Sequence, residues 1–431
     1  MDKKSRQIVK KAENHLRLLM GGAFVGLLAL ILVYCIPTAP MKEHLYQSLP
    51  MLEKEFVSSE LIDGYPGSLT GNFTDCLMLE NAVYQSEEHT MLEQILFMYR
   101  GESGTGDGWA PGYSLEDYIG GIQQPREVEY ARYWHGYLVV LKPLLFLTTF
   151  NSLRIMSSAF QLILVGMIVM ALYRRQEEFL GMAFLVSMPF LYYFGLYASL
   201  SLSICFYLMA GFMLIQLKWD ERLRKQGWYG EFFLLAGMFT SYFDFLTYPL
   251  ITLAFPLCVC LYLDKDGADK SLKKLVGYSM EWGVGYLGLW VLKWVLTDFL
   301  VGGNVIKDGW NAILERTDAA AESTRAAGFF SVLRQNMSAY FNWGFYLLGL
   351  GIAVWLIVTI LKNKKVITKQ TFTEGMVLWA IALYPLVWFF FTQNHSDEHW
   401  IFTFKILAAT VFACICGIGK MCRCGEEKSN I

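Results

Sequence analysis

The chain has 431 residues, of which 55% are hydrophobic and only 17% are charged. Soluble domains contain about 25% charged residues, so this deficit argues against a soluble enzyme and against an intrinsically disordered chain. The formal net charge is -2, which provides no global positive field, and we expect no nucleic-acid partner. The composition therefore predicts an integral membrane protein, with the lipid bilayer as part of its solvent.

The apolar residues fall in blocks long enough for membrane helices, which need about 20 residues each. These blocks lack period-2 alternation, which favours helices over strands. The first block follows the basic segment MDKKSRQIVKK and is interpreted as a retained signal anchor. The sequence thus predicts an all-α, polytopic transmembrane bundle of about ten spans. The predicted spans are 16–36, 153–173, 179–197, 198–217, 231–249, 250–263, 275–298, 342–361, 375–392 and 400–419.

Lys and Arg concentrate on one side of this arrangement. Of the 36 Lys and Arg residues, 23 fall in the segments that would face the cytoplasm. The positive-inside rule then places both termini in the cytoplasm of a multi-pass plasma-membrane protein, and we expect a bacterial one. The resulting division is a cytoplasmic N-terminus (1–15), a first span (16–36), a first outer loop (37–152), spans (153–299), a second outer segment (300–341), spans (342–419) and a cytoplasmic tail (420–431).

One further apolar segment, 135–150, complicates this topology. If it crossed the membrane, every later loop would change sides and the basic clusters would face outward. It has only sixteen residues and contains Lys142-Pro143 in its middle. We therefore predict that it forms a re-entrant or interfacial helix on the outer side.

The first outer loop carries secondary structure of its own. The segment 75–100 is predicted to form one amphipathic helix, with Thr74 as its N-cap, and a glycine-rich stretch, 101–113, follows it. In the second outer segment, short helices are predicted at 309–324 and 328–340. Outer loops this long are usually functional rather than connective.

Four short stretches place polar groups at the outer membrane border, namely 71–75, 130–137, 241–249 and 393–399. Two aspartates in them are candidate catalytic residues. Asp244 lies late in a predicted span, where a carboxylate is costly and by default marks a functional site or a buried pair. Asp75 opens the predicted amphipathic helix, where the helix dipole alone would also favour an acid. Both interpretations of Asp75 stay open.

The same stretches contain candidate ligands for an anion. Arg132, His135 and Lys142 gather positive or protonatable groups in an otherwise acidic loop, which suits an anionic headgroup. The alternative is interfacial anchoring together with the neighbouring Tyr and Trp residues. His395 and His399 are four residues apart, so one helical face can present both to a phosphate. A structural role for this pair is the alternative.

No cofactor is implied with certainty. The C-x-C cysteine pairs do not have the spacing of a zinc site, and two histidines without a nearby carboxylate ligand are weak grounds for a metal. We predict no metal site, and a divalent cation stays an open alternative. No phosphate-binding glycine motif for nucleotides is present.

This layout resembles the C-type (GT-C-like) membrane glycosyltransferases, which use polyprenyl-phosphate sugars as donors. The resemblance lies in the inner N-terminus, the large first outer loop with an acidic residue, and a short helix that begins with a polar-proline motif. Here 132–137 (RYWHGY) with Lys142-Pro143 occupies the place of that motif. The following 151–159 (NSLRIMSSA) is similar to the family's arginine-and-small-residue start of the next span.

The resemblance implies a reaction and a set of roles. A sugar would move from a polyprenyl-phosphate donor to an acceptor hydroxyl on a glycan or lipid-linked acceptor at the outer face. Asp75 would be the general base, and Asp244 would position the acceptor or a cationic partner. The departing lipid phosphate would be stabilised by cationic and histidine side chains, namely Arg132, His135, Lys142, His395 and His399.

Two other functions stay open. A transporter or flippase of a lipid-linked saccharide would use the same headgroup contacts without breaking a bond. It should show polar residues or broken helices near the bilayer midplane, and the sparse polarity there favours the enzyme. A structural scaffold would need none of the predicted site residues.

Overall fold

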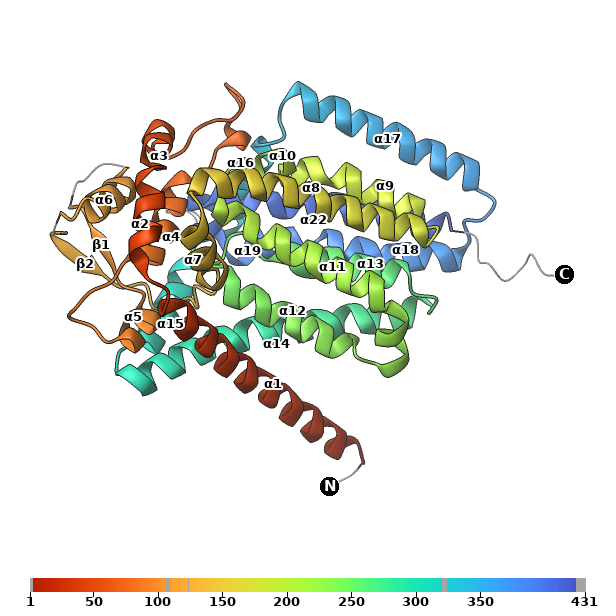
Figure 1. Ribbon diagram of the computed structural model, residues 1–431. Helices are drawn as coiled ribbons and strands as arrows, with labels where there is room; N and C mark the ends of the chain where they lie inside the picture. The colour runs from red at the N-terminus through yellow and green to blue at the C-terminus, as the bar shows by residue number, and fades with distance from the viewer. Residues whose placement is uncertain (1–2, 105–108, 123, 320–323, 424–431) are drawn as a thin grey trace.

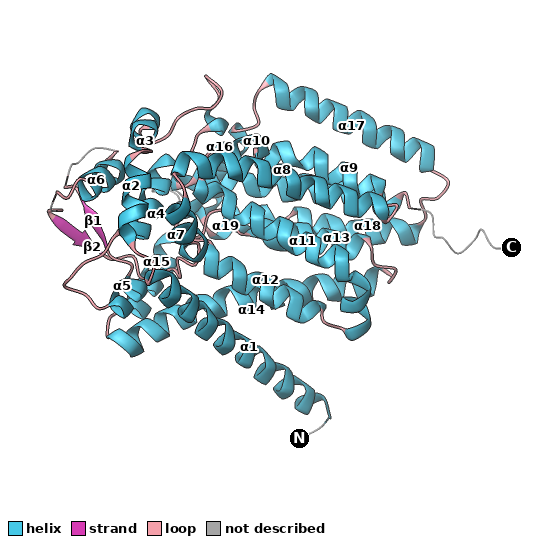
Figure 2. Cartoon of the chain, in the orientation of Figure 1, coloured by secondary structure: helices cyan, strands magenta, loops and turns pink. Residues whose placement is uncertain are grey.

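The computed structural model describes residues 3–104, 109–122, 124–319 and 324–423, and the regular secondary structure in this part of the chain is almost entirely helical (Figure 2). The all-α prediction is confirmed there. The one sheet found in this part is an antiparallel pair, β1 (Arg100–Glu102) and β2 (Arg126–Val128), in which Gly101 pairs with Glu127. Parts of the predicted glycine-rich loop and cytoplasmic tail, 105–108 and 424–431, lie outside the described residues.

Within the described ranges, seven helical segments are long and apolar enough to cross a membrane, in agreement with the predicted membrane protein. They are Val9–Tyr34 in α1 (Lys3–Tyr34), α8 (Phe150–Arg174), α11 (Leu200–Gln226), α14 (Ala268–Val301), α17 (Trp343–Asn363), α18 with α19 (Lys369–Ala382 and Tyr384–Phe391), and α21, η3 and α22 (Trp400–Thr403, Phe404–Ile406 and Leu407–Met421). Shorter helices in the bundle are α9 (Glu178–Ser187) with η2 (Met188–Leu191), α10 (Tyr193–Leu196), α12 (Tyr229–Phe243) and α13 (Leu250–Tyr262).

The remaining elements gather at one end of the long helices (Figure 1). We call this the loop end. It contains α2 (Thr38–Tyr46), α3 (Leu49–Glu55), η1 (Pro66–Ser68), α4 (Asn72–Val83), α5 (Met91–Phe97), β1, α6 (Ala110–Ile119), β2, α7 (Leu138–Leu147), α15 (Val305–Thr317), α16 (Arg325–Ser338) and α20 (Gln393–Glu398). The start of α1 and the end of α22 lie away from it (Figure 1).

The prediction of one amphipathic helix over 75–100 is wrong. The segment forms two helices, α4 and α5, and α4 begins at Asn72 instead of after Thr74. Thr90 caps α5, because its hydroxyl accepts from the Glu93 N–H at 3.3 Å and the Glu93 carboxylate accepts from the Thr90 N–H at 2.8 Å. This reciprocal capping box starts a new helix where the apolar spacing alone suggested continuity. The predicted short helices of the second outer segment are confirmed as α15 and α16, with shifted bounds.

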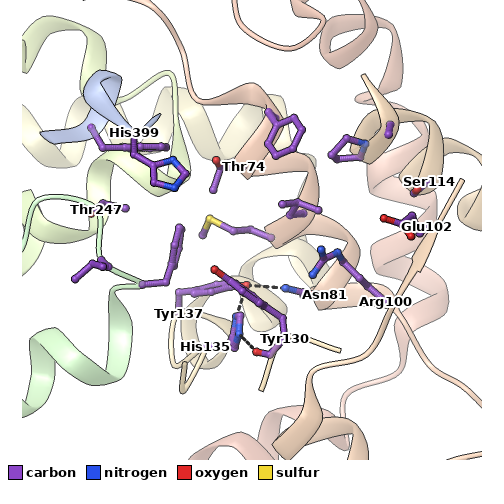
Figure 3. A pocket seen from close by; sticks show the side chains of 18 of the residues that line it. Thr74, Asn81, Arg100, Glu102, Ser114, Tyr130, His135, Tyr137, Thr247 and His399 are labelled. Atoms are coloured by element: carbon purple, nitrogen blue, oxygen red, sulfur yellow. Dashed lines mark hydrogen bonds between the residues drawn. The ribbon is translucent and has the colours of Figure 1, made fainter. Parts of the chain in front are cut away.

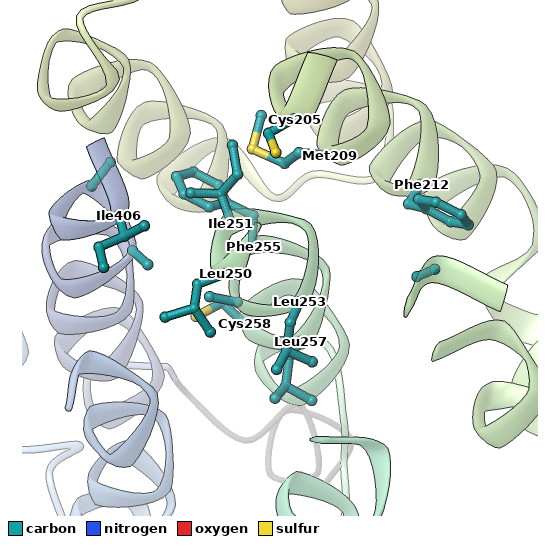
Figure 4. Close-up of a cluster of buried hydrophobic side chains, with 14 of the residues drawn as sticks. Cys205, Met209, Phe212, Leu250, Ile251, Leu253, Phe255, Leu257, Cys258 and Ile406 are labelled. Carbon is teal, nitrogen blue, oxygen red and sulfur yellow. The ribbon is translucent and has the colours of Figure 1, made fainter. Parts of the chain in front are cut away.

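The core of the bundle forms around α13, in which every residue from Leu250 to Tyr262 is buried. Figure 4 shows its side chains facing Cys205 and Met209 of α11 and Ile406 of η3. The rings of Phe255 in α13 and Phe412 in α22 stack with centroids 4.6 Å apart. In contrast, α17 has no buried residue although it is strongly apolar, which fits a helix whose surface is solvated by lipid.

Two glycines allow α12 and α14 to approach closely. A Cβ at Gly237 would lie 2.0 Å from the Trp282 carbonyl oxygen, and one at Gly285 would lie 2.0 Å from the Leu234 carbonyl oxygen. Small residues at such crossings let helix backbones touch, the usual way in which membrane helices associate. The start of α14 lies at one end of the bundle, and the turn that follows α12 lies at the other end.

Three of the basic clusters predicted to face the cytoplasm, those at 174–175, 218–225 and 264–274, meet at the end of the bundle opposite the loop end, which we call the basic end. Asp220 pairs with Arg175 at 3.6 Å and with Arg224 at 2.9 Å. Asp264 pairs with Arg224 at 3.3 Å and with Lys274 at 2.5 Å. These ion pairs connect the ends of α8, α11, α13 and α14, so Arg175, Arg224 and Lys274 balance buried carboxylates.

Candidate functional site

A cavity of about 490 Å³ lies between the loop end and the helical bundle. Figure 3 shows His399 and Thr247 toward one end of it and Arg100 and Glu102 toward the other. Its walls combine charged, aromatic and apolar groups from segments far apart in the chain. They are Phe73, Thr74, Leu77, Met78 and Asn81 of α4, Arg100–Glu102 of β1, Ala110, Pro111 and Ser114 of α6, Tyr130, His135, Tyr137, the turn Phe245–Thr247, Arg316 of α15, His395, His399 and Phe402.

Two arginines in this wall give the cavity a positive character. Arg316 places one guanidinium nitrogen 2.7 Å from Nδ1 of His395. Arg100 lies over the Tyr130 ring with its guanidinium carbon 5.7 Å from the centroid, and its Nη1 is buried without a hydrogen-bond partner. In the described part of the chain neither guanidinium forms an ion pair with a carboxylate. Their charges are therefore available to an anionic ligand.

His135 lies in the cavity wall and belongs to a chain of hydrogen bonds. Its Nε2 donates to the Tyr130 carbonyl at 3.0 Å, and its Nδ1 accepts from the Tyr137 hydroxyl at 3.2 Å. That hydroxyl in turn accepts from the Asn81 side chain at 3.1 Å (Figure 3). Burial lowers the pKa of His135 to about 3, so the ring is neutral at physiological pH. The structure thus brings His135 to the site, with both ring nitrogens already used by the protein.

His395 and His399 lie together in the wall, with ring centroids 4.9 Å apart. His395 donates from Nε2 to the Leu246 carbonyl at 2.8 Å, which leaves Nδ1 as an acceptor for Arg316. Burial and the Arg316 charge hold the pKa of His395 well below its usual value and lower that of His399 to about 4. Both imidazoles are therefore neutral at pH 7, and the ring of His399 lies half-buried at the cavity surface.

Asp75 is fully buried and does not line the cavity. Its carboxylate accepts from the Leu200 N–H at 2.9 Å, the Ser201 N–H at 3.0 Å and the Ser201 hydroxyl at 2.8 Å. It therefore satisfies the unpaired N–H groups at the start of α11 and fixes α4 to the bundle. Burial raises the pKa of Asp75 to about 6 in spite of these hydrogen bonds. The general-base role of Asp75 stays a prediction. Its hydrogen bonds give it a structural role, because they hold α4 against the start of α11.

Asp244 also lies outside the cavity wall, directly after α12. Its carboxylate accepts from the Leu246 N–H at 2.9 Å, the Thr247 N–H at 3.0 Å and the Thr247 hydroxyl. Phe245, Leu246 and Thr247 do line the cavity, so Asp244 shapes the wall through the backbone of this turn.

Arg132 and Lys142 are not among the lining residues. The Arg132 guanidinium lies 3.6 Å from the Asp308 carboxylate and 5.0 Å from the Tyr130 ring centroid. The Lys142 ammonium is buried, donates to the Ala82 carbonyl at 2.7 Å and lies over the Tyr34 ring. Lys142 thus joins α7 to α4 and α1, and neither cation lines the cavity with the three histidines.

The sequence reasoning missed Arg100, Arg316 and Asn81. Charged residues in polar loops are ordinary, so neither arginine carried a signal of its own. Asn81 is 3% exposed and its Oδ1 has no hydrogen-bond partner. Among the described residues no group of three or more His, Cys, Asp or Glu is placed to hold a metal ion.

The Glu80 carboxyl, next to Asn81, makes the stability of the site pH-dependent. It is fully buried, with one oxygen accepting from the Gly101 N–H at 2.8 Å and the other without a partner. Burial raises its pKa to about 8, against the opposing influence of Arg100. The folded protein therefore keeps a proton that the unfolded chain releases above its usual pKa of about 4.3. Unfolding then becomes easier as pH rises from about 5 to about 8.

We expect Glu80→Gln to flatten this pH dependence, because the amide stays neutral in both states. The measurement is the thermal unfolding midpoint in detergent, followed by tryptophan fluorescence across that pH range. Glu87→Gln, at an exposed position of the same loop, is the matched control and should keep the wild-type slope. Equal slopes for wild type and Glu80→Gln would contradict the prediction.

No protein family, curated protein or solved structure matches this chain.

Proposed function

We propose that this protein is a membrane glycosyltransferase that moves a sugar from a polyprenyl-phosphate donor to an acceptor hydroxyl at the outer face of a bacterial plasma membrane. The observation that carries this proposal is the cavity at the loop end, whose two arginines have no carboxylate partner among the described residues. A lipid-linked sugar phosphate combines an anionic head with a hydrocarbon tail, and the cavity lies where polar loops meet lipid-compatible helices.

The topology that we propose for this reaction has about ten crossings. Seven long spans are joined by three shorter passes, α9 with η2, α12 and α13, which lie inside the bundle. The short helix α7 packs on α1, α2 and α4 at the loop end and serves as the interfacial helix. With the basic end in the cytoplasm, the cavity faces outward.

The proposed reaction uses the groups that face the cavity. The acceptor hydroxyl oxygen forms a bond to the anomeric carbon of the sugar as the bond from that carbon to the phosphate oxygen breaks. Arg100 and Arg316 stabilise the negative charge that grows on the departing polyprenyl phosphate. His399 takes the hydroxyl proton, because it is neutral and reaches the cavity. Burial is the main cause of the low pKa of His399, and the Arg316 charge is the second; a phosphate beside Arg316 would offset this second cause and make His399 a stronger base.

The test is a transfer assay with the full-length protein in lipid nanodiscs. Polyprenyl-phosphate sugars labelled in the sugar are mixed with a lipid extract of the host membrane as a source of acceptors. We expect the label to move to an acceptor and free polyprenyl phosphate to accumulate in equal amount. In a parallel liposome assay, movement of the intact labelled lipid between leaflets without release of polyprenyl phosphate would reject the proposal in favour of a flippase.

A further inference from the structure

The turn after α12 has an unusual backbone that is held by Asp244. Leu246 adopts a positive φ of 73°, in the left-handed region that L residues with a branched side chain rarely occupy. The Asp244 carboxylate accepts from the backbone N–H groups of Leu246 and Thr247 and from the Thr247 hydroxyl. These three hydrogen bonds offset the cost of the strained conformation and fix the direction of the Leu246 carbonyl.

The Leu246 carbonyl determines which ring nitrogen of His395 carries the proton. It accepts from Nε2 of His395 at 2.8 Å, so the proton of the neutral ring must reside on Nε2. Nδ1 is then a bare acceptor, and it lies 2.7 Å from the Arg316 guanidinium, which can only donate. His395 is buried, with 3% of its surface exposed, so both of its contacts are shielded from water.

The hydrogen-bond partner of Arg316 determines whether its positive charge stays available to a ligand. A carboxylate partner would hold the guanidinium in place but also neutralise it. A neutral imidazole holds it by one hydrogen bond and leaves its positive charge and its remaining N–H donors free for the cavity. The same turn thus orients an arginine without consuming its capacity to bind an anion.

We propose that Asp244 is a positioning residue, which acts through the Leu246 carbonyl and the neutral His395 to aim the Arg316 guanidinium at a phosphate group in the cavity. This inference rests on the proposed function for the identity of the anion, a lipid-linked phosphate. Asp244 does not line the cavity, and the proposal therefore predicts that its effect on phosphate binding depends on the presence of Arg316.

A double-mutant cycle on phosphate binding tests this dependence. Geranyl phosphate and inorganic phosphate are titrated separately into the purified full-length protein, so that a lipid-linked ligand is distinguished from free phosphate. We expect Arg316→Gln and Asp244→Asn each to weaken geranyl phosphate binding by about 10- to 100-fold. The double variant should bind no more weakly than Arg316→Gln alone, within about threefold. A purely structural role of Asp244 would instead give losses that multiply.

His395→Phe provides a second route if Asp244→Asn does not fold. It removes the acceptor for Arg316 while keeping a ring in the wall, and it should also show no further loss when combined with Arg316→Gln. Asp308→Asn is the matched control, because Asp308 pairs with Arg132 away from the cavity. It should leave binding unchanged.

Multiplying losses, or unchanged binding in Asp244→Asn, would overturn the inference, as would a wild-type protein that binds neither phosphate. Its failure is distinguishable from that of the proposed function. Coupled phosphate binding without sugar transfer would reject the transferase and retain the positioning role. Sugar transfer with independent effects of Asp244 and Arg316 would reject the positioning role alone.

Discussion

Replacing Arg316 with glutamine is expected to lower the kcat/KM of sugar transfer by about 100- to 1,000-fold, the usual cost of removing one preorganised charged donor from a transition state. The expected loss is large because Arg316 faces the cavity without a carboxylate partner among the described residues. Negative charge grows on the departing phosphate during the reaction, so kcat should fall more than KM rises. The nanodisc transfer assay measures both parameters.

Arg132→Gln is the matched control for this experiment. Arg132 belongs to the same loop end, but its guanidinium pairs with Asp308 at 3.6 Å and does not line the cavity. Its removal should change kcat/KM by less than about threefold, as expected for a partly exposed ion pair. If Arg132→Gln abolished transfer and Arg316→Gln did not, the placement of the phosphate in this cavity would be wrong.

Replacing Asp75 with alanine is expected to destabilise the protein by about 2–4 kcal/mol, since it leaves buried donors at the start of α11 without an acceptor. The three donors are the N–H groups of Leu200 and Ser201 and the Ser201 hydroxyl. Asp75→Asn keeps one acceptor oxygen and should lose less. Thermal unfolding in detergent measures the change, and transfer activity is normalised to folded protein.

The comparison with Asp75→Asn separates the two interpretations of this residue. With a structural role, the variant is less stable, but its kcat per folded molecule stays within about threefold of wild type. A variant with wild-type stability and no turnover would instead make Asp75, and not His399, the general base. Asp63→Ala, at an exposed position of the same loop, should alter neither property.

Of the predicted site residues, the three histidines line the cavity and the two aspartates do not. The spacing of His395 and His399 indicated a shared face, and both residues line the cavity together with His135. Asp75 and Asp244 drew attention because carboxylates at a membrane border are costly, and the structure places both carboxylates on backbone N–H groups. A sequence pattern reports that such a charge needs a partner, but not whether the partner is a substrate or the protein itself.

The sequence by itself determined that this is a helical membrane protein, which segments are apolar enough to cross and where polar residues collect, because these properties are sums over neighbouring residues. Only the tertiary structure decided which side chains share the cavity. Arg100 and Arg316 are separated by more than two hundred residues, and the packing of the loop end on the bundle brings both to the lining of one cavity. Whether an arginine keeps its charge free depends on the atoms around it, and contacts between distant segments set those atoms.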